Sequence, residues 1–313
     1  MTRQPGKSAE LTIRGITVRL SRLDKQLFSD AEISKGDLIS YYQSIAHKIL
    51  PFLRDRPLVM GRYPDGINGE AFLQKNAPGH FPEWVTRAEV PKHGGMDRQV
   101  ICDKPATLIY LANQACIELH PFLSRLGKLD QPDQLVFDLD PPDAGHFDLA
   151  RLAALNLRAL LTDRLDLAAY VNTTGGKGLH VHVPLRPGDH FDAVRDFARQ
   201  TADLLVSQDP ALFTTAQRRQ DRGGRLYLDI MRNSYAQTAV APYSVRARPG
   251  ATIATPLHWH ELEDNSLKPD HFTIRTIGKR SHTVSDPWAG MTRHRHNLSG
   301  PRRRLHALRV GSG

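Results

Sequence analysis

The chain has 313 residues, and its 42 Lys and Arg against 33 Asp and Glu give a formal net charge of +9. A hydrophobic content of 40% is typical of a packed globular core rather than of a disordered chain. No apolar run approaches the roughly 18 residues of a membrane span, no signal peptide is recognisable, and two cysteines cannot form a disulfide framework, so we expect a soluble cytoplasmic protein with no membrane partner.

Three stretches of different composition follow one another along the chain. Residues 1–10 are polar and are predicted to form a flexible N-terminus, and residues 11–290 have the apolar pattern of a folded domain. Residues 291–313 contain six arginines and no acidic residue, which predicts a basic, flexible C-terminal tail that orders on contact with phosphate. The positive charge favours a nucleic-acid partner and is also compatible with a solvated basic surface.

Helical and strand patterns alternate through the folded part. Ser34 and Asp37 form a predicted capping box, after which Leu38, Tyr42 and Ile45 recur at helical spacing, and Pro51 is predicted to end the helix. Further helices are predicted at about 148–162 and 190–206, and strands at 58–62, 134–140, 179–183 and 225–230. The pattern indicates a mixed α and β fold.

The strand predicted at 134–140 ends in two aspartates. Asp138 and Asp140 are two residues apart, so their carboxylates leave the strand on the same face, and Pro141 and Pro142 then end the ladder. Two like charges at close range favour a divalent cation bound by oxygen ligands. The alternative is a solvated turn after the strand, and the Asp-x-Asp pattern alone leaves both interpretations open.

A glycine-rich segment leads into the strand predicted at 179–183. Three glycines within residues 175–178 surround Lys177, so backbone N–H groups and the ammonium group can receive phosphate oxygens. The strand then presents His180 and His182 on one face. The segment is not a P-loop, because no Ser or Thr follows Lys177 and a strand comes next. It predicts an anion cradle, with a glycine-rich hairpin as the alternative.

The strand predicted at 225–230 offers a third carboxylate. Tyr227 and Asp229 share one face of this strand. Arginines are frequent around the strand and in the segment that follows it: Arg218, Arg219, Arg222, Arg225, Arg232, Arg246 and Arg248. Their guanidinium groups match the charge of a triphosphate or of DNA, and an ordinary basic surface is the alternative.

In their order along the chain, these motifs resemble the polymerase domain of bacterial ligase D, a member of the archaeo-eukaryotic primase superfamily, here as a stand-alone chain. The resemblance covers nearly all of residues 11–290. The most specific motifs that carry it are Phe137-Asp138-Leu139-Asp140-Pro141, Gly175-Gly176-Lys177-Gly178-Leu179-His180, Leu228-Asp229-Ile230-Met231-Arg232-Asn233 and Ala241-Pro242-Tyr243-Ser244-Val245-Arg246-Ala247-Arg248. A shorter match is Glu118-Leu119-His120-Pro121.

The resemblance implies a fold and an active site. The implied fold is α+β and archaeo-eukaryotic primase-like, with mixed and antiparallel central sheets flanked by helices and a catalytic cleft between two β-rich halves. Asp138, Asp140 and Asp229 are implied to be catalytic and to bind two divalent ions, Mn²⁺ or Mg²⁺, which hold the incoming NTP or dNTP and the primer 3′ hydroxyl. The residues implied to surround the nucleotide are His120, Thr174, Gly175, Lys177, His180, Arg222, Arg232 and Arg246.

The resemblance also implies contacts with DNA. Arg22, Lys25 and Lys35 fall where the family binds the 5′ phosphate of gapped or broken DNA. Phe72 falls where an aromatic ring stacks on the template, and Arg248 is also assigned to DNA. The implied function is template-directed addition of ribo- or deoxynucleotides to a primer, for gap filling in end joining or excision repair. Ku and a separate DNA ligase are the implied protein partners, and the bacterial nucleoid is the implied location.

Two positions depart from the family pattern. Thr174 stands where the family usually has Ser, which keeps the hydroxyl but adds a methyl group in a crowded pocket. Leu73 stands where a second aromatic residue is common, so stacking on the template depends on Phe72. The chain also ends where ligase D continues into other domains, so no ligase activity is expected.

Two other functions compete with the polymerase. Asp-x-Asp after an apolar strand also serves phosphohydrolases and phosphotransferases, in which Asp138 would be the nucleophile. Such enzymes normally have the pair on the first strand, whereas here it is in the middle of the chain. The other alternative is a non-catalytic nucleic-acid-binding module whose acidic residues are structural.

Overall fold

The computed structural model describes residues 7–310 of the chain, apart from the side chains of residues 281–283. Contacts within the chain divide it into two compact units. Unit 1 consists of residues 1–122, 240–254 and 272–278, and unit 2 consists of residues 123–239, 255–271 and 279–313. Each unit is therefore assembled from segments that lie far apart in the sequence.

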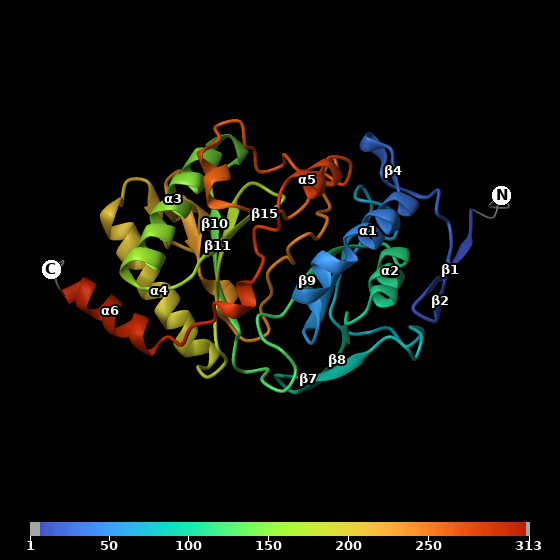
Figure 1. Cartoon of the computed structure of the whole chain (residues 1–313), viewed down its shortest axis with the longest axis horizontal. Coiled ribbons are helices and arrows are strands. Elements are labelled where there is room, and N and C mark those ends of the chain that lie inside the picture. The colour runs from blue at the N-terminus through green and yellow to red at the C-terminus, as the bar shows by residue number, and fades with distance from the viewer. Residues whose placement is uncertain (1–6, 311–313) are drawn as a thin grey trace. The chain divides into compact units, whose positions relative to one another are not determined.

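The described part of unit 1 is built around an antiparallel sheet of five strands, in which β6, β5, β8 and β7 follow one another and β9 also pairs with β5. Its strands are β5 (Pro57–Arg62), β6 (Phe72–Gln74), β7 (Arg87–Lys92), β8 (Gly95–Ile101) and β9 (Cys116–Pro121). Two hairpins precede it, β1 (Ala9–Ile13) with β2 (Ile16–Leu20) and β3 (Gln26–Phe28) with β4 (Ile33–Ser34). Helices α1 (Lys35–Leu53) and α2 (Pro105–Asn113) pack against each other (Figure 1).

Helix α1 begins as the sequence predicted and ends later. The Ser34 side chain accepts a hydrogen bond from the Asp37 backbone N–H, and the Asp37 carboxylate accepts one from the Ser34 backbone N–H, which completes the capping box. Pro51 lies inside the helix rather than at its end, and the helix continues to Leu53. Leu53 is buried on the same side as the core residues of the helix, and this packing compensates for the hydrogen bond that a proline cannot donate.

Unit 2 contains the strands that the sequence singled out for chemistry. Its described strands form a sheet in the order β13, β14, β10, β12, β11 and β15, with every neighbouring pair antiparallel except β13 and β14. The strands are β10 (Gln134–Asp140), β11 (Tyr170–Thr173), β12 (Leu179–Pro184), β13 (Phe213–Thr214), β14 (Leu226–Asp229) and β15 (Pro256–Leu257). The strands predicted at 134–140, 179–183 and 225–230 are thus confirmed as neighbours at the centre of this sheet.

Helices α3 (Phe147–Ala159) and α4 (Phe191–Gln208) contact β10 and lie together on one side of it (Figure 1). They confirm the helices predicted at 148–162 and 190–206, and a π-helical turn over Leu160–Arg164 continues α3. The short helix α5 (Ile277–Thr283) follows near the end of the chain. None of the helices within the described residues combines the length and the hydropathy that crossing a bilayer requires.

The structure differs from the expectation of flexible ends. At the N-terminus residues 9–13 already form β1, while residues 1–6 of the predicted flexible segment lie outside the described residues. At the C-terminus helix α6 (Ser299–Val310) packs against α4, with Leu305 buried. Ion pairs from Arg302 to Asp189, 2.8 Å, and from Arg304 to Asp166, 3.1 Å, fasten it further. Apolar residues at helical spacing form one buried face of α6. The many arginines between them make this spacing hard to recognise in the sequence.

Candidate active site

Asp138 and Asp229 are directly opposite each other on neighbouring strands. They are register partners in the antiparallel pairing of β10 with β14. Cross-strand partners project from the same face of a sheet, about 5 Å apart at Cβ. Asp140, two residues after Asp138, projects from this face too, opposite Tyr227. The carboxylates that the sequence spread over two motifs therefore share one face of one sheet.

Two nitrogen-bearing side chains, those of His180 and Arg232, contact Asp138. Nε2 of His180, its register partner on β12, lies 3.5 Å from Oδ2 of Asp138. Nη2 of Arg232 donates to the same oxygen at 3.2 Å. Burial alone would raise the pKa of Asp138, but His180 and Arg232 outweigh burial and lower this pKa to about 2. Asp138 is therefore ionised at neutral pH.

Asp229 has a different environment from that of its partner. Its Oδ1 accepts hydrogen bonds from the Met231 backbone N–H, 2.7 Å, and from the Tyr227 hydroxyl, 3.3 Å. Burial raises the pKa of Asp229, the Met231 N–H opposes this shift, and the charge of Asp138 adds to it. The pair thus contains one carboxylate that is easily ionised and one that resists ionisation, as expected for like charges held close together.

Asp140 is bound by two cationic side chains that the resemblance assigned to the nucleotide. Lys177 Nζ lies 3.0 Å from Oδ1 of Asp140, and Arg222 Nη1 lies 3.1 Å from Oδ2. The Arg222 guanidinium also stacks over the Tyr227 ring, 3.9 Å from its centroid. Lys177 in addition donates to the Pro141 carbonyl at 2.8 Å. The structure therefore brings these residues together.

The glycine-rich segment is an ordered turn between β11 and β12. The Thr174 hydroxyl donates to the Gly178 carbonyl at 3.1 Å and accepts from the Gly176 N–H at 3.1 Å, so it shapes the loop itself. Gly175 has a φ of +63°, in the region that favours glycine. A Cβ at Gly178 would lie 2.0 Å from the Leu139 carbonyl oxygen, so no side chain fits there. The loop consequently comes as close to β10 as a backbone can.

No cluster of three or more His, Cys, Asp and Glu side chains in the described part of the chain is placed to hold a metal ion. The carboxylates instead contact Arg232, Lys177 and Arg222. Hard oxygen donors on one face of neighbouring strands are nevertheless the chemistry that Mg²⁺ and Mn²⁺ accept. The donor set fits, and a metal site here stays a prediction that requires these cationic side chains to give way.

The other two residues assigned to the nucleotide belong to unit 1. His120 lies on β9, and Arg246 lies in the segment 240–254. Both contact Glu118: its Oε2 is 3.1 Å from Nε2 of His120, and its Oε1 accepts from Nε of Arg246 at 2.8 Å. The structure thus divides the predicted nucleotide-binding residues into two groups, one in each unit.

The residues predicted to bind a 5′ phosphate lie around the start of α1. Backbone N–H groups of Lys35 and Gly36 donate to carbonyls of Lys25 and Leu23, which folds the loop over residues 22–25 against the helix. Arg22 is exposed, and Lys25 forms an ion pair with Asp65 at 2.7 Å. Lys35 is only 4% exposed, and its Nζ donates to the Asn113 carbonyl at 3.1 Å. The charges of Arg22 and Lys25 act on Lys35, so the three cations lie near one another, and their assignment to a 5′ phosphate stays a prediction.

The remaining DNA-binding predictions fall on exposed positions of unit 1. Phe72, on the edge strand β6, is 46% exposed, and the neighbouring Leu73 is 73% exposed. Arg248 is also exposed. These side chains can reach a ligand, and their assignment to DNA stays a prediction.

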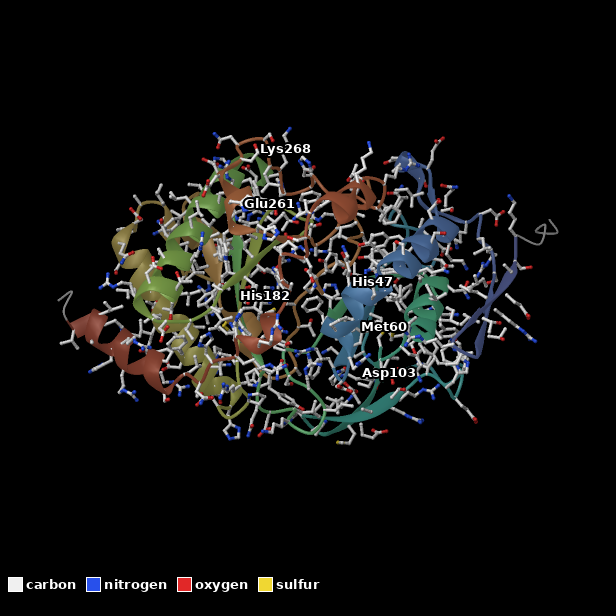
Figure 2. The ribbon with its side chains drawn as sticks, viewed as in Figure 1. His47, Met60, Asp103, His182, Glu261 and Lys268 are labelled. Carbon is white, nitrogen blue, oxygen red and sulfur yellow. The ribbon has the colours of Figure 1, made fainter. Side chains whose placement is uncertain are left out.

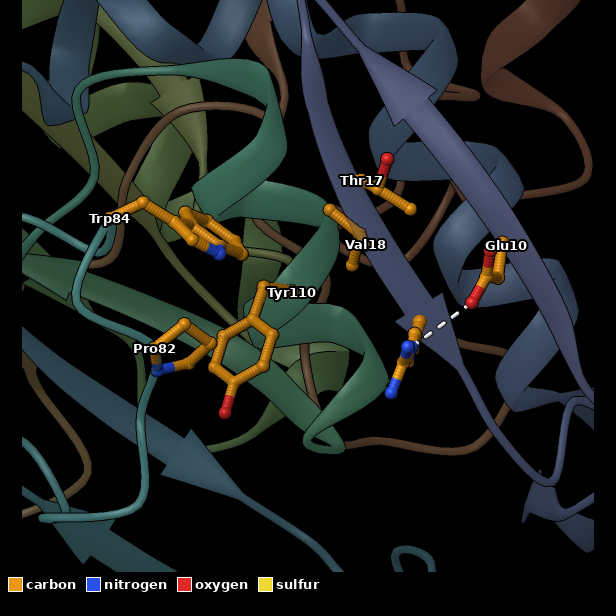
Figure 3. A pocket seen from close by; sticks show the side chains of 7 residues that line it. Glu10, Thr17, Val18, Pro82, Trp84 and Tyr110 are labelled. Atoms are coloured by element: carbon orange, nitrogen blue, oxygen red, sulfur yellow. Dashed lines mark hydrogen bonds and ion pairs between the residues drawn. The ribbon is translucent and has the colours of Figure 1, made fainter.

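A pocket of about 540 Å³ lies elsewhere in unit 1, between the β1–β2 hairpin and the aromatic rings of Trp84 and Tyr110 (Figure 3). Glu10 and Arg19 form an ion pair at its rim, 3.0 Å. None of the predicted site residues lines this pocket.

Three buried or half-buried residues that the sequence did not single out for a role support the site. Glu118 binds His120 and Arg246, as described above. Asn233, fully buried, donates to the Val136 carbonyl at 2.7 Å and accepts from the Val136 N–H at 2.8 Å, so its side chain continues the ladder of β10 beyond the end of β14. His182 on β12 is buried among the strands (Figure 2), where its Nδ1 lies 3.2 Å from Oε1 of Gln134. Alternation along a strand, of Glu118 with His120 and of His182 with His180, is a signal for two of the three, and Asn233 has no such signal.

Comparison with known proteins finds relatives over most of the chain. A family model described as the LigD primase-polymerase domain matches residues 34–288. The bifunctional non-homologous end joining protein LigD of Bacillus subtilis is 35% identical over 262 residues, which cover 83% of this chain and 42% of that protein. The multifunctional non-homologous end joining protein LigD of Mycolicibacterium smegmatis is 35% identical over 253 residues, covering 80% and 33% of the two chains. This chain thus spans between a third and somewhat over two fifths of these relatives.

The fold has a close counterpart among solved structures. The polymerase domain from Mycobacterium tuberculosis ligase D in complex with DNA superposes with a TM-score of 0.82 and 31% sequence identity, covering 89% of this chain and 99% of that one. The predicted α+β primase-polymerase fold is confirmed. The resemblance seen in the motifs is confirmed as well, and the chain belongs to the family of LigD primase-polymerase domains.

Proposed function

We propose that this chain is a template-directed nucleotidyltransferase that adds ribo- or deoxynucleotides to the 3′ end of a DNA primer and fills gaps at broken or excised DNA. The observation that carries the proposal is the register pairing of Asp138 with Asp229, with Asp140 on the same face, in a chain of this family. Three carboxylates on one face of two neighbouring strands serve catalysis better than stability, because their mutual repulsion has to be offset by other groups.

Asp138, Asp140 and Asp229 would hold two Mg²⁺ or Mn²⁺ ions, which would acidify the primer hydroxyl and stabilise the departing pyrophosphate. These carboxylates now bind Arg232, Lys177 and Arg222. For the carboxylates to hold such ions, Arg232, Lys177 and Arg222 would have to give up these contacts. The lysine and the arginines would then be available to the triphosphate, whose charge would attract them.

The contribution of the chain itself is positioning and charge. The backbone of the glycine loop and Lys177 would receive phosphate oxygens, and Arg222, steadied by its stacking on Tyr227, would stabilise charge that develops on the phosphates. Transferred phosphoryl groups need little covalent help from a protein, so losing one well-placed cation would lower the rate by several powers of ten.

Contact with DNA ends would depend on unit 1. Arg22, Lys25 and Lys35 would bind the 5′ phosphate on the far side of a gap, Phe72 would stack on the template, and Arg248 would add a phosphate contact. Named relatives are end-joining proteins, which supports a role at broken DNA ends. Ku and a separate DNA ligase as partners, and the cytoplasm as the place of action, are part of this proposal.

The test is incorporation of labelled nucleotide on a gapped duplex, with NTP against dNTP and Mn²⁺ against Mg²⁺. Replacing Asp138→Asn together with Asp140→Asn is expected to abolish incorporation and to leave DNA binding nearly unchanged, because it removes metal ligands but no DNA contact. The matched control is Asp143→Asn, an exposed acid in the same unit, which should retain wild-type activity.

The same assay separates the competing functions. Release of phosphate without primer extension would identify a phosphohydrolase. DNA binding without any metal-dependent incorporation by the wild-type chain would identify a binding module. Robust extension by the double variant would refute the assignment of the carboxylates.

A further inference from the structure

Glu118 is a buried acid that the proposed chemistry does not use. It lies on β9, and its side chain is 10% exposed. Its register partner on β5 is Gly61, and a Cβ at Gly61 would lie 2.8 Å from Cβ of Glu118 and 3.4 Å from its Oε2. The absence of a side chain at Gly61 is thus what gives the carboxylate its space.

The two oxygens of Glu118 have separate partners. Oε1 accepts from Nε of Arg246 at 2.8 Å and from the Ala247 backbone N–H at 3.0 Å. Oε2 lies 3.1 Å from Nε2 of His120, two residues along the same strand. One carboxylate therefore joins β9 to a segment that lies more than 100 residues further along the chain and fixes the orientation of the His120 and Arg246 side chains.

The charge of Glu118 is part of this arrangement. Burial would raise the pKa of the carboxyl, but His120 and Arg246 outweigh burial and hold the pKa well below its ordinary range. Glu118 is ionised at any pH at which the protein would work. A buried carboxylate costs free energy unless hydrogen bonds satisfy it, and here they occupy both oxygens.

We propose that Glu118 is a positioning residue for nucleotide binding, which fixes the orientation in which His120 and Arg246 would meet the triphosphate. The inference depends on the function proposed above. Glu118 itself does not contact the nucleotide, because a carboxylate would repel the phosphates. Its effect is exerted through the two side chains that it binds, and so it concerns nucleotide binding rather than the carboxylates of unit 2 that are proposed to hold metal ions.

The test compares Glu118→Gln with wild type in steady-state incorporation. The amide cannot accept a hydrogen bond on its nitrogen and carries no charge, so His120 and Arg246 lose their common anchor. We expect the KM for nucleotide to rise about tenfold or more, while kcat falls less than about threefold and the affinity for primer-template DNA is unchanged. The matched control is Glu89→Gln, an exposed glutamate of the same unit beside Arg98, which should change neither constant.

A double-variant cycle distinguishes positioning from a merely structural role. If Glu118 acts through Arg246, Glu118→Gln should raise KM much less in an Arg246→Ala background than in wild type. Where Glu118→Gln fails to fold, Glu118→Asp keeps the charge but withdraws it by one methylene, and the same rise in KM with normal thermal unfolding is expected. A wild-type KM in a folded Glu118 variant overturns the inference, and so does full additivity with Arg246→Ala. An inactive wild-type chain would instead refute the proposed function.

Discussion

The acidic face of unit 2 and the basic cluster of unit 1 are held in place by different means. Backbone geometry positions Asp138 and Asp229, which pair in register and are flanked by a glycine that touches β10 and by the buried side chain of Asn233. The predicted phosphate site instead consists of the charged ends of long side chains. Arg22 and Lys25 extend from a loop, and the Lys35 ammonium group donates a hydrogen bond to the Asn113 carbonyl.

This difference teaches where each site tolerates change. A metal-dependent reaction requires carboxylates placed within a fraction of an ångström, which only a packed backbone supplies. Binding of a phosphate requires positive charge nearby, which flexible side chains supply in many conformations. We therefore expect steep effects from small changes in unit 2 and graded effects, sensitive to salt and pH, in unit 1.

The largest effect should come from Gly178→Ala. The new methyl group would lie 2.0 Å from the Leu139 carbonyl oxygen, between Asp138 and Asp140, so β10 and the loop must separate. We expect incorporation to fall at least about a hundredfold, because an error of 1 Å in positioning has that cost, and the free energy of unfolding to fall by about 1–3 kcal/mol. Steady-state kinetics and urea unfolding measure the two effects.

Gly188→Ala is the control for this prediction. Gly188 belongs to the same unit, and a Cβ there meets no atom within 4 Å. Its substitution should leave activity and stability near wild type. If Gly178→Ala were equally harmless, the positions of the carboxylates would not depend on the contact between Gly178 and Leu139. The proposed difference between backbone positioning in unit 2 and side-chain positioning in unit 1 would then be wrong.

A smaller loss of activity, with a loss of stability of similar size, is expected from Asn233→Ala. The substitution removes three hydrogen bonds, two to the Val136 backbone and one to the Ile230 carbonyl, and leaves buried backbone groups without partners. We expect the free energy of unfolding to fall by about 2–3 kcal/mol and activity to fall with it, because β10 and β14 are no longer tied beyond Asp229. Thermal unfolding followed by circular dichroism measures the stability.

The exposed Asn297 provides the comparison, since Asn297→Ala should change stability by less than about 0.5 kcal/mol. An Asn233→Ala variant with wild-type stability would show that the hydrogen bonds between the Asn233 side chain and the Val136 backbone are dispensable.

The sequence predicted the strands of the acidic face well, for a physical reason. Alternation of polar with buried apolar residues, as in Phe137, Asp138 and Leu139, is a local signal of a strand and of the face each residue occupies. That Asp229 pairs with Asp138 is a long-range fact, which the residues alone left open and the family resemblance supplied.

Features that arise from contacts between distant segments were missed. The burial of Lys35 results from the loop over residues 22–25, which folds onto the start of the helix. Nothing in the local sequence around a lysine in the first turn of a helix predicts that it is buried. The anchoring role of Glu118 depends on a segment far along the chain, and the packing of α6 depends on α4. In each case the contacting residues lie far away in the sequence, so a local sequence pattern cannot predict the contact.

The smallest effect is expected in the pH dependence of 5′-phosphate binding. It tests whether flexible side chains position the predicted phosphate site of unit 1. Burial lowers the pKa of Lys35 to about 8, the charges of Arg22 and Lys25 act in the same direction, and Asp24 opposes them. Only the ammonium form of Lys35 attracts phosphate. With this pKa, about nine-tenths of the Lys35 side chains are protonated at pH 7 and about one-tenth at pH 9.

The preference for a gap with a 5′ phosphate over one with a 5′ hydroxyl should therefore fall between pH 7 and pH 9, by up to about tenfold, as binding comes to require uptake of a proton. Fluorescence anisotropy with the two gapped duplexes at constant ionic strength measures this ratio. In Lys35→Arg the guanidinium stays charged throughout, so the preference should be independent of pH, and in Lys35→Met it should be weak at every pH. An equal decline in wild type and Lys35→Arg would mean that another group titrates. A full preference retained by Lys35→Met would mean that the buried lysine serves the fold through Asn113 and that Arg22 and Lys25 alone bind the phosphate.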